Sequence, residues 1–425
     1  MRSPFAVLII LIMMVLLDRY IYLALKTVTG NASPNTTSIV FTIYWIITIG
    51  AIIMYLLFVL TGSDFLPKNV RTYMFAIVVG LFFSKIVSFI FFFVDDIRRG
   101  VTWIVQKLFV SNSSDLATQA DGISRSVFLS WLGLAAGGTL FTTLLYGFSN
   151  KYDYQVKRLS LDFENLPPAF NGLKLAHFSD VHSGSFTDKE AVKRGIDMIM
   201  TEKPDLIVFS GDLVNNEASE IKPYLDIFSK LQAPLGIYST LGNHDYGDYI
   251  SWPIDGVTKQ QNLLNLARHH AQLGWRLLMN EHFPIKKGGD EIAILGIENW
   301  SAKARFPKYG DMAKAYAGSE KYPFKILVSH DPSHWDAQVI TQYSDVDVTL
   351  SGHTHGMQFG VEIPGFKWSP VQYVYKEWAG LYEEGKQKLY VNRGYGFIGY
   401  PGRVGILPEI TLLEFTNKKG VVSAS

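Results

Sequence analysis

The sequence predicts an all-α transmembrane region of about four helices followed by a soluble domain with a layered α/β fold. Three observations support this prediction. Apolar residues make up 48% of the chain, and they are concentrated in its first 150 residues. From about residue 154 onward, short apolar runs alternate with amphipathic stretches. Polar side chains follow these apolar runs directly, as at the ligand-binding edge of an α/β sheet. We therefore divide the chain into residues 1–150 and 151–425.

Four stretches of the N-terminal region match the roughly 20 apolar residues that cross the hydrocarbon core of a bilayer. They lie near residues 5–25, 39–62, 73–94 and 127–148. The second and fourth contain no charged residue, and the third contains only Lys85. Buried helices of soluble domains are usually shorter and show a polar face, so we interpret these stretches as membrane spans.

The first stretch is interrupted by Asp18 and Arg19. A cleaved signal peptide is one interpretation, but no small-residue cleavage site stands out. We favour a retained span in which Asp18 and Arg19 are paired or lie near an interface. Lys85 is expected to face the helix bundle or to extend its side chain to the membrane surface.

The segment between the third and fourth spans has two parts. Residues 95–109, DDIRRGVTWIVQKLF, repeat apolar residues at helical spacing. This spacing fits an amphipathic helix on the membrane surface, and it fits an ordinary solvated helix equally well. Residues 111–124 predict a polar loop. Basic residues after the last span favour a cytoplasmic soluble domain, whereas those of the third loop argue against it.

The soluble region predicts strands that alternate with helices. LKLAHF, LIVF, GIYSTL, EIAILGI, FKILV and VDVTL are short apolar runs of the kind found in strands covered on both faces. Between the first two, Thr187 and Glu190 form a capping-box pattern that predicts the start of a helix. This alternation predicts a layered α/β fold.

Polar side chains follow the ends of these predicted strands. In chain order they are Asp180, His182, Asp212, Asn243, His244, His330, His353 and His355. Because ligand sites of α/β sheets lie at the carboxyl ends of the strands, we expect these side chains to converge.

The residue types in this set indicate metal binding. The chain has no cysteine, so a metal would be held by nitrogen and oxygen atoms, which suit Mn, Fe or Zn. Each residue taken alone is more often an ordinary turn or core residue. Seven candidate ligands together are too many for one tetrahedral centre, and they fit two cations bridged by the carboxylate of Asp212.

The motifs SDVH, SGDLV, GNHDYG, VSHDP and GHTHG, in this order, resemble those of the calcineurin-like metallophosphoesterase superfamily. The resemblance covers residues 173–415. YVNRGYGFIGYPGRVGILPEI is similar to the C-terminal end of the bacterial branch often called YkuE- or YaeI-like, which a membrane-bound UDP-diacylglucosamine pyrophosphatase also resembles. The resemblance implies a four-layer α/β/β/α sandwich. Met357 replaces a glycine frequent in this branch, which we expect to change only the shape of the pocket.

The resemblance also implies roles for the matching residues. Asp180, His182 and His355 would bind the first metal, Asn243, His330 and His353 the second, and Asp212 both. A metal-bound hydroxide would attack phosphorus in line. His244 would protonate the leaving oxygen or stabilise its charge, and Asp245 would orient the imidazole of His244.

We therefore predict a membrane-anchored, dinuclear-metal phosphoesterase that hydrolyses a phosphoester or pyrophosphate bond. The predicted location is the bacterial inner membrane, with the catalytic domain in the cytoplasm. The substrate would be a phosphorylated small molecule or a lipid-linked one, because an anchored enzyme and a lipid share the plane of the membrane. A net charge of +1 gives no general attraction to nucleic acid.

Several alternatives remain at the level of the sequence. One is a non-enzymatic signalling or scaffold protein with the same domain, although an intact ligand set disfavours it. Another is transport through the helices with the soluble domain as regulator, which four spans with one internal lysine support little. Nuclease and protein phosphatase activity also remain open, although the sequence shows neither a basic stripe nor an obvious peptide groove. Arg393 and Arg403 in the glycine-rich C-terminal run would either contact phosphate or pack the loop.

Overall fold

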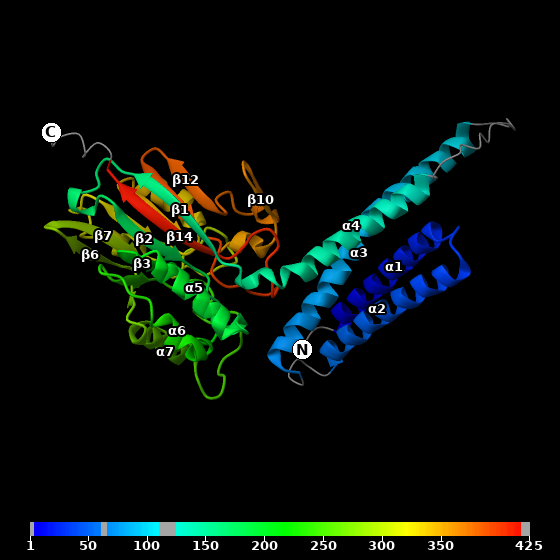
Figure 1. Ribbon diagram of the computed structural model, residues 1–425, viewed down its shortest axis with the longest axis horizontal. Coiled ribbons are helices and arrows are strands. Elements are labelled where there is room, and N and C mark those ends of the chain that lie inside the picture. Colours follow the sequence, from blue (N-terminus) through cyan, green and yellow to red (C-terminus); the bar gives the residue numbers. More distant parts are fainter. Residues whose placement is uncertain (1–3, 61–65, 110–124, 418–425) are drawn as a thin grey trace. The chain divides into compact units, whose positions relative to one another are not determined.

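The computed structural model describes residues 4–60, 66–109 and 125–417 (Figure 1). The chain divides into two compact units, an N-terminal unit of residues 1–146 and a C-terminal unit of residues 147–425. Each unit is built around its own buried residues.

In the described residues, the N-terminal unit is formed by four long helices. They are α1 (Pro4–Val28), α2 (Pro34–Leu60), α3 (Lys68–Phe109) and α4 (Arg125–Gly147). Each is long and apolar enough to cross a membrane, with mean hydropathy between 1.5 and 2.5. This confirms the predicted four-helix region. The last residues of the predicted span 39–62 and the predicted polar loop 111–124 lie outside the described residues.

Residues 95–109 do not form a separate surface helix. They continue the third span without a break, so that α3 runs for 42 residues. Ion pairs one turn apart support this continuation, since Arg98 lies 2.8 Å and Arg99 3.3 Å from the carboxylate of Asp95. The change from apolar to charged sequence at Asp95 therefore does not end the helix.

Asp18 and Lys85, two charged residues inside the spans, belong to a network that joins three helices. Lys85 on α3 donates to the carboxylate of Asp18 on α1 and to Thr48 Oγ1 on α2 at 3.0 Å. Asp18 Oδ1 also accepts from Thr48 Oγ1 at 3.1 Å and from the Tyr44 hydroxyl at 3.0 Å. Asp18 and Lys85 are both buried. This confirms that Asp18 is paired and that Lys85 faces the bundle.

The described part of the C-terminal unit contains two six-stranded sheets (Figure 1). The first has the order β1 (Gln155–Asp162), β14 (Glu409–Thr416), β2 (Leu173–Phe178), β3 (Leu206–Phe209), β4 (Ile237–Ser239) and β5 (Arg276–Leu277). The second has the order β12 (Gly380–Glu384), β13 (Gln387–Val391), β9 (Val348–Ser351), β8 (Lys325–Val328), β7 (Asp290–Gly296) and β6 (Glu281–Lys287). The strands that carry the predicted site, β2–β3–β4 and β8–β9, are parallel within each sheet.

Buried residues form three successive cores, which define four layers. Alternate residues of β3 enter different cores: Ile207 and Phe209 pack under the helices α5 (Lys189–Thr201), α6 (Leu225–Phe228) and α7 (Lys259–Gln272), and Leu206 and Val208 pack between the sheets. Leu327 of β8 enters a third core, which includes Ala315 of α8 (Met312–Tyr316). The period of two residues on both sheets confirms the predicted α/β/β/α sandwich.

The helix after β2 begins one residue later than the predicted capping box requires. Asp188 is the N-cap of α5, and its carboxylate accepts the backbone N–H of Ala191. The backbone N–H of Thr187 instead donates to the Tyr152 hydroxyl at 2.8 Å. Because this tertiary contact fixes Thr187, the neighbouring aspartate caps the helix.

Candidate metal centre

The eight predicted strand-end residues lie at the carboxyl ends of strands from both sheets. Asp180 and His182 follow β2, Asp212 follows β3, Asn243 and His244 follow β4, His330 follows β8, and His353 and His355 follow β9. Within the described residues, two groups bring possible ligand atoms within 4.8 Å of one another: Asp180, His182 and His355, and Asp180, Asp212 and His330. Asp180 belongs to both groups, so the two groups form one cluster.

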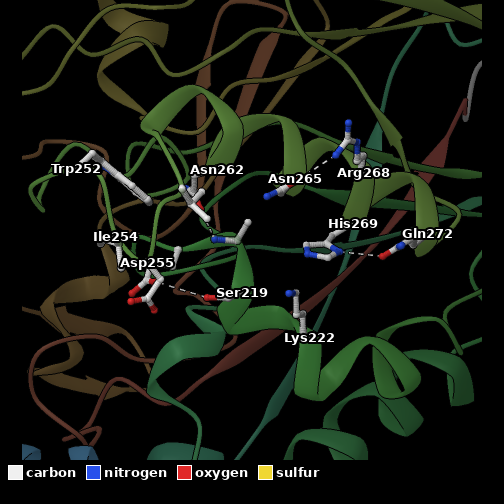
Figure 2. A pocket seen from close by; sticks show the side chains of 13 residues that line it. Ser219, Lys222, Trp252, Ile254, Asp255, Asn262, Asn265, Arg268, His269 and Gln272 are labelled. Carbon is white, nitrogen blue, oxygen red and sulfur yellow. Dashed lines mark hydrogen bonds between the residues drawn. The ribbon is translucent and has the colours of Figure 1, made fainter.

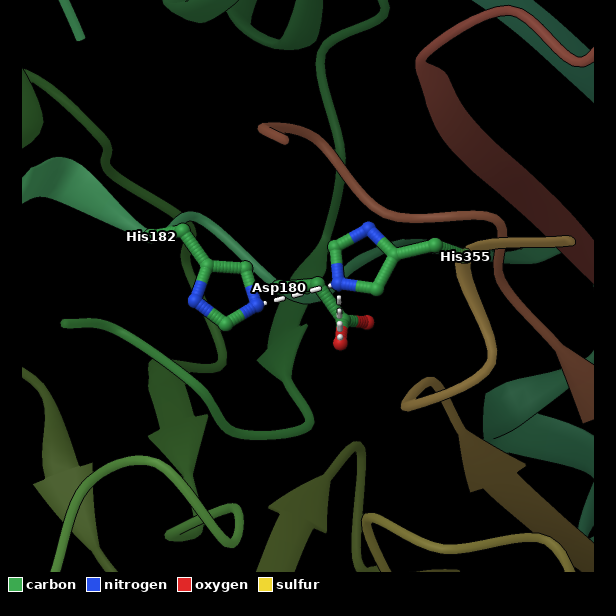
Figure 3. Close-up of side chains that lie close together, drawn as sticks. All are labelled: Asp180, His182 and His355. Atoms are coloured by element: carbon green, nitrogen blue, oxygen red, sulfur yellow. Dashed lines mark hydrogen bonds and ion pairs between the residues drawn. The ribbon is translucent and has the colours of Figure 1, made fainter. Parts of the chain in front are cut away.

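In the first group, three potential ligand atoms face one point (Figure 3). His182 Nε2 lies 3.0 Å from His355 Nε2, and His355 Nε2 lies 3.2 Å from Asp180 Oδ1. Figure 3 shows the two imidazole rings with their nitrogens turned toward each other beside the carboxylate. A cation between these atoms would take their lone pairs, which a single proton satisfies only in part.

His330 presents a nitrogen without a matching donor. Its Nδ1 donates to the Ser210 carbonyl oxygen at 2.7 Å, which leaves the lone pair on Nε2. This Nε2 is buried, lies 3.1 Å from Asp212 Oδ2, and has no hydrogen-bond partner in the described part of the chain. A lone pair that faces a carboxylate oxygen is unfavourable unless a proton or a cation lies between them.

The pKa of His330 reflects the need for positive charge between its imidazole and the neighbouring carboxylates. Burial alone would lower the pKa of His330, but Asp212 and Asp180 outweigh burial and raise its pKa to about 10. Burial would raise the pKa of Asp212, but the neighbouring His330 and His244 hold it well below the usual range. A divalent cation in this position would replace the proton.

Asn243 and His353 form a second place where acceptor atoms meet. His353 Nδ1 lies 2.7 Å from Asn243 Oδ1. The amide of Asn243 is fixed by Tyr249, to whose hydroxyl its nitrogen donates at 2.8 Å. The other nitrogen of His353, Nε2, lies 2.8 Å from the Tyr375 hydroxyl, which donates to Asp331. This outer contact directs the Nδ1 lone pair of His353 toward Asn243, as ligands of a metal are commonly held.

His244 differs from these residues in its partners. Its backbone N–H donates to Asp212 Oδ1 at 2.8 Å, and its Nδ1 donates to the Asn215 carbonyl oxygen at 2.8 Å. The Nε2 atom is thereby left for the pocket that His244 lines. This nitrogen can carry a proton to or from a bound molecule.

The prediction that Asp245 orients the imidazole of His244 is wrong. The carboxylate of Asp245 is buried and accepts backbone N–H groups of Gly242 at 2.9 Å, Asp212 at 2.8 Å and Leu213 at 2.8 Å. The carbonyl of Asn215 holds the ring instead. A short carboxylate that already accepts several backbone donors shapes the turn that carries Asp212, and it does not reach the imidazole.

The backbone at the site is strained. Asp180, His182, Asp212, His353 and His355 have φ angles of 52°, 47°, 63°, 71° and 51°. Non-glycine residues in this left-handed region cost about 1–3 kcal/mol each, and such residues cluster at functional sites. This backbone conformation, just past the strand ends, directs the five side chains toward a common centre.

Two glycines make room for the carboxylates of the cluster. A Cβ atom on Gly242 would lie 2.2 Å from Asp212 Oδ1, and one on Gly352 would lie 2.3 Å from Asp180 Oδ2. Any other residue at these two positions would displace a predicted ligand.

A pocket of about 310 Å³ opens onto the cluster. Its lining includes Phe306, together with Arg305 and Tyr375, which the sequence reasoning did not identify as site residues. Apolar side chains form much of the remaining wall: Met357, Val371, Val374 and Ile398. Met357 thus affects the shape of the pocket, as expected.

Arg393 and Arg403 do not line this pocket. Arg393 is buried and pairs with Glu409 and, at 2.8 Å, with Glu362. Arg403 is fully buried and donates to backbone carbonyls, including that of Arg393 at 2.7 Å. Of the two alternatives for these arginines, the structure supports loop packing.

A second cavity, of about 350 Å³, lies beside α7 and is separate from the cluster (Figure 2). Its labelled side chains include Trp252, Asp255, Arg268 and His269, and none of the predicted ligands is among its lining residues. Several polar groups in this cavity pair locally, as His269 Nδ1 does with Gln272 at 2.8 Å and Arg268 with Asn265 at 3.2 Å. The chemistry therefore concentrates in the smaller pocket.

Comparison with known proteins agrees with this geometry. Residues 173–357 match the family described as "Calcineurin-like phosphoesterase", and residues 1–151 match "Probable Calcineurin-like phosphoesterase, transmembrane domain". Metallophosphoesterase YkuE of Bacillus subtilis is 31% identical over 306 residues, which cover 69% of this chain and 99% of YkuE. The chain belongs to the calcineurin-like metallophosphoesterase family. Members of this family are metal-dependent phosphoric ester hydrolases, and the buried Asp and His groups fit divalent metals.

Two further relatives of this metallophosphoesterase carry more informative names. The zebrafish "Transmembrane protein with metallophosphoesterase domain" is 31% identical over 60% of this chain, and the match spans only 56% of that protein. UDP-2,3-diacylglucosamine pyrophosphatase LpxG of Chlamydia trachomatis is 27% identical over 60% of this chain and 88% of its own length.

Proposed function

We propose that this protein hydrolyses a phosphoester or pyrophosphate bond with two divalent cations, Mn, Fe or Zn, bound at the cluster. The proposed ligands are Asp180, His182 and His355 for the first cation, Asn243, His330 and His353 for the second, and Asp212 for both. The observation that carries this proposal is the meeting of acceptor atoms without donors, above all His330 Nε2 against Asp212 Oδ2 at 3.1 Å. Only positive charge makes such an arrangement stable.

Each part of the site has a distinct task in this proposal. The cations, when bound, supply Lewis acidity and offset the charge of the phosphoryl oxygens. Arg305 on the pocket wall adds a fixed positive charge that suits a phosphoryl oxygen. His244, held through Nδ1 by Asn215, delivers a proton from Nε2 to the leaving oxygen. Asp245 acts as a positioning residue, because it fixes the turn that carries Asp212.

We propose further that the substrate is amphiphilic, a phosphate or pyrophosphate attached to a lipid. The apolar wall formed by Val371, Val374 and Ile398 beside the cluster supports this, as does the name of the relative LpxG. The proposed setting is a bacterial inner membrane, with residues 1–150 as the anchor and residues 151–425 facing the cytoplasm. A scaffold without activity is the competing function, but it would have no use for five strained residues at one point.

The test is hydrolysis by the full-length protein in detergent with added Mn²⁺. The substrates are p-nitrophenyl phosphate, bis-p-nitrophenyl phosphate and a nucleoside-diphosphate lipid, and the variant is Asn243→Ala. We expect turnover of at least one bond type that is lost in the variant. Turnover that the variant retains, or the absence of turnover on every substrate by protein loaded with metal, would support the scaffold.

A further inference from the structure

A small hairpin next to the metal pocket has one apolar and one charged face, and its apolar residues are exposed. It consists of β10 (Val361–Ile363) and β11 (Phe366–Trp368), which pair with each other and with no other strand in the described residues. The register places Val361 opposite Trp368 and Ile363 opposite Phe366. Because side chains alternate along a strand, these four apolar residues share one face, and Glu362 and Lys367 share the other.

The two charged side chains of the hairpin bond to the body of the domain, Glu362 from a half-buried position and Lys367 from an exposed one. Glu362 pairs with Arg393 at 2.8 Å and with Lys157 at 3.4 Å. Lys367 Nζ donates to the Ala379 carbonyl oxygen at 2.5 Å and lies 5.5 Å from the centre of a ring of Trp378. Both charged side chains thus act as attachments of the hairpin to the domain.

The apolar face is left on the outside. Ile363 is 57% exposed, Phe366 53% and Val361 43%. A hairpin surrounded by water would place these side chains inward and its charges outward. The inverted arrangement marks a surface that meets an apolar partner.

Further exposed apolar side chains lie near the mouth of the metal pocket. Tyr373 and Val374, just beyond β11, are 77% and 51% exposed, and Met357 is 57% exposed. Met357 and Val374 also line the pocket. Exposed apolar side chains therefore lie both on the hairpin and at the metal pocket.

Backbone hydrogen bonds connect the base of the hairpin to the end of the fourth candidate span. Gly147, the last residue of the fourth candidate span, accepts the backbone N–H of Arg403 at 2.9 Å. The next residue, Val404, donates to Gln358 at 2.8 Å and accepts from Gly360 at 2.9 Å. The strand β10 begins at the residue after Gly360. The base of the hairpin is thus tied by backbone bonds to the point where the chain leaves the membrane span.

We propose that the apolar face of the hairpin, with Tyr373 and Val374, embeds in the lipid–water interface of the bilayer that holds the four spans. Tyrosine and tryptophan are the side chains preferred at this interface, and Trp368 and Tyr373 supply both. The contact places the pocket mouth at the level of the lipid headgroups. Access of a lipid-borne phosphate to the cations follows from this placement and rests on the proposed function, whereas the membrane contact does not.

The absence of cysteine from the sequence makes a direct test simple. Ile363→Cys and Phe366→Cys are made singly in the full-length protein, labelled with an environment-sensitive fluorophore and placed in phosphatidylcholine–phosphatidylglycerol nanodiscs. Leu264→Cys on α7 is the matched control, because Leu264 is 52% exposed, close to the values for Ile363 and Phe366. The readouts are the emission wavelength, quenching by doxyl-labelled lipid and quenching by aqueous iodide.

We expect blue-shifted emission and quenching by doxyl lipid at positions 363 and 366, and quenching by iodide alone at position 264. Iodide quenching at all three positions would overturn the proposal. Protection from both quenchers at positions 363 and 366 would also overturn it, because the cover would then be protein, such as a second copy of this chain. These outcomes do not depend on turnover.

A second measurement tests the consequence for the substrate. Phe366→Ser should raise KM for a lipid-borne pyrophosphate in nanodiscs by roughly tenfold, because a large apolar contact is lost. The same change should leave hydrolysis of soluble bis-p-nitrophenyl phosphate unaltered, as should Leu264→Ser for both substrates. Equal KM values for the lipid substrate in Phe366→Ser and Leu264→Ser would contradict access through this surface.

Discussion

Two buried clusters of charge in this molecule have opposite hydrogen-bonding character. In the N-terminal unit, Lys85 supplies the donors and Asp18 the acceptors, with Thr48 and Tyr44 completing the set. In the C-terminal unit, the carboxylate of Asp212 faces His330 Nε2, which has no hydrogen-bond partner among the described residues, and the carboxylate of Asp180 lies 3.2 Å from His355 Nε2. The first cluster is complete within the protein, and the second requires positive charge from outside.

The difference indicates that the first cluster stabilises the fold and that the second serves the chemistry of the site. A paired and hydrogen-bonded charge in an apolar setting holds its helices in one arrangement, and removal of one partner costs stability. A convergent set of acceptors on strained backbone contributes little to stability and instead binds cations. Substitutions in the two clusters should therefore change different observables.

The largest expected effect is that of Asp212→Asn. The amide cannot bridge two cations as the carboxylate does, so turnover should fall on the order of 10³-fold and the bound metal per chain should fall with it. Turnover of the best substrate and metal content measured by mass spectrometry would show this. Asp347→Asn is the matched control, since Asp347 is also buried but accepts the backbone N–H of Lys325 away from the site. Equal losses in both variants would contradict the assignment.

Lys85→Met should act on stability. It leaves Asp18 buried without its counter-charge, which costs about 3–5 kcal/mol in comparable buried pairs. The double variant Lys85→Met with Asp18→Asn should recover most of this loss. Unfolding in detergent would be compared for the single and double variants, with turnover per folded molecule as the second readout. A single variant as stable as the parent would show that the pair is not structural.

His244→Gln should lower turnover by about 10²-fold through loss of the proton donor, while metal content stays unchanged. The effect should depend on the leaving group. An alkyl phosphate needs protonation of its leaving oxygen, whereas p-nitrophenolate leaves without it. A loss of equal size for both substrates would assign His244 to binding rather than to proton transfer.

The smallest expected effect is that of Tyr375→Phe, which removes the contact between the Tyr375 hydroxyl and His353 Nε2. Outer contacts of this kind support ligand orientation, so metal affinity should fall by roughly tenfold. Titration of the metal-stripped protein with Mn²⁺ would measure this, and excess Mn²⁺ should restore turnover. Failure of excess metal to restore turnover would give Tyr375 a direct role in the reaction.

The site residues that could be predicted from the sequence are those that directly follow the carboxyl ends of strands. Asp180, Asp212 and His330 follow apolar strands directly, and parallel strands bring their carboxyl ends to one edge. Arg305 and Tyr375 escaped prediction because they lie on loops whose path depends on tertiary packing. The partner of His244 escaped for the same reason, since the Asn215 carbonyl comes from the loop after β3.

Local patterns also failed where side-chain contacts decide the structure. The charged residues at 95–99 suggested a break, but their ion pairs continue α3. The alternation VEI…FKW shows that the hairpin has two faces. Only the contacts of Glu362 and Lys367 reveal that the apolar face is the outer one.

The most direct test of the central claim is the number and position of bound cations. The full-length protein would be stripped with a chelator, reloaded with Mn²⁺, and examined by mass spectrometry and by anomalous diffraction from crystals. The account predicts two cations per chain, one beside His182 and His355 and one beside Asn243 and His330, with turnover lost on stripping and regained on reloading. A single cation elsewhere, or turnover that survives complete removal of metal, would contradict it.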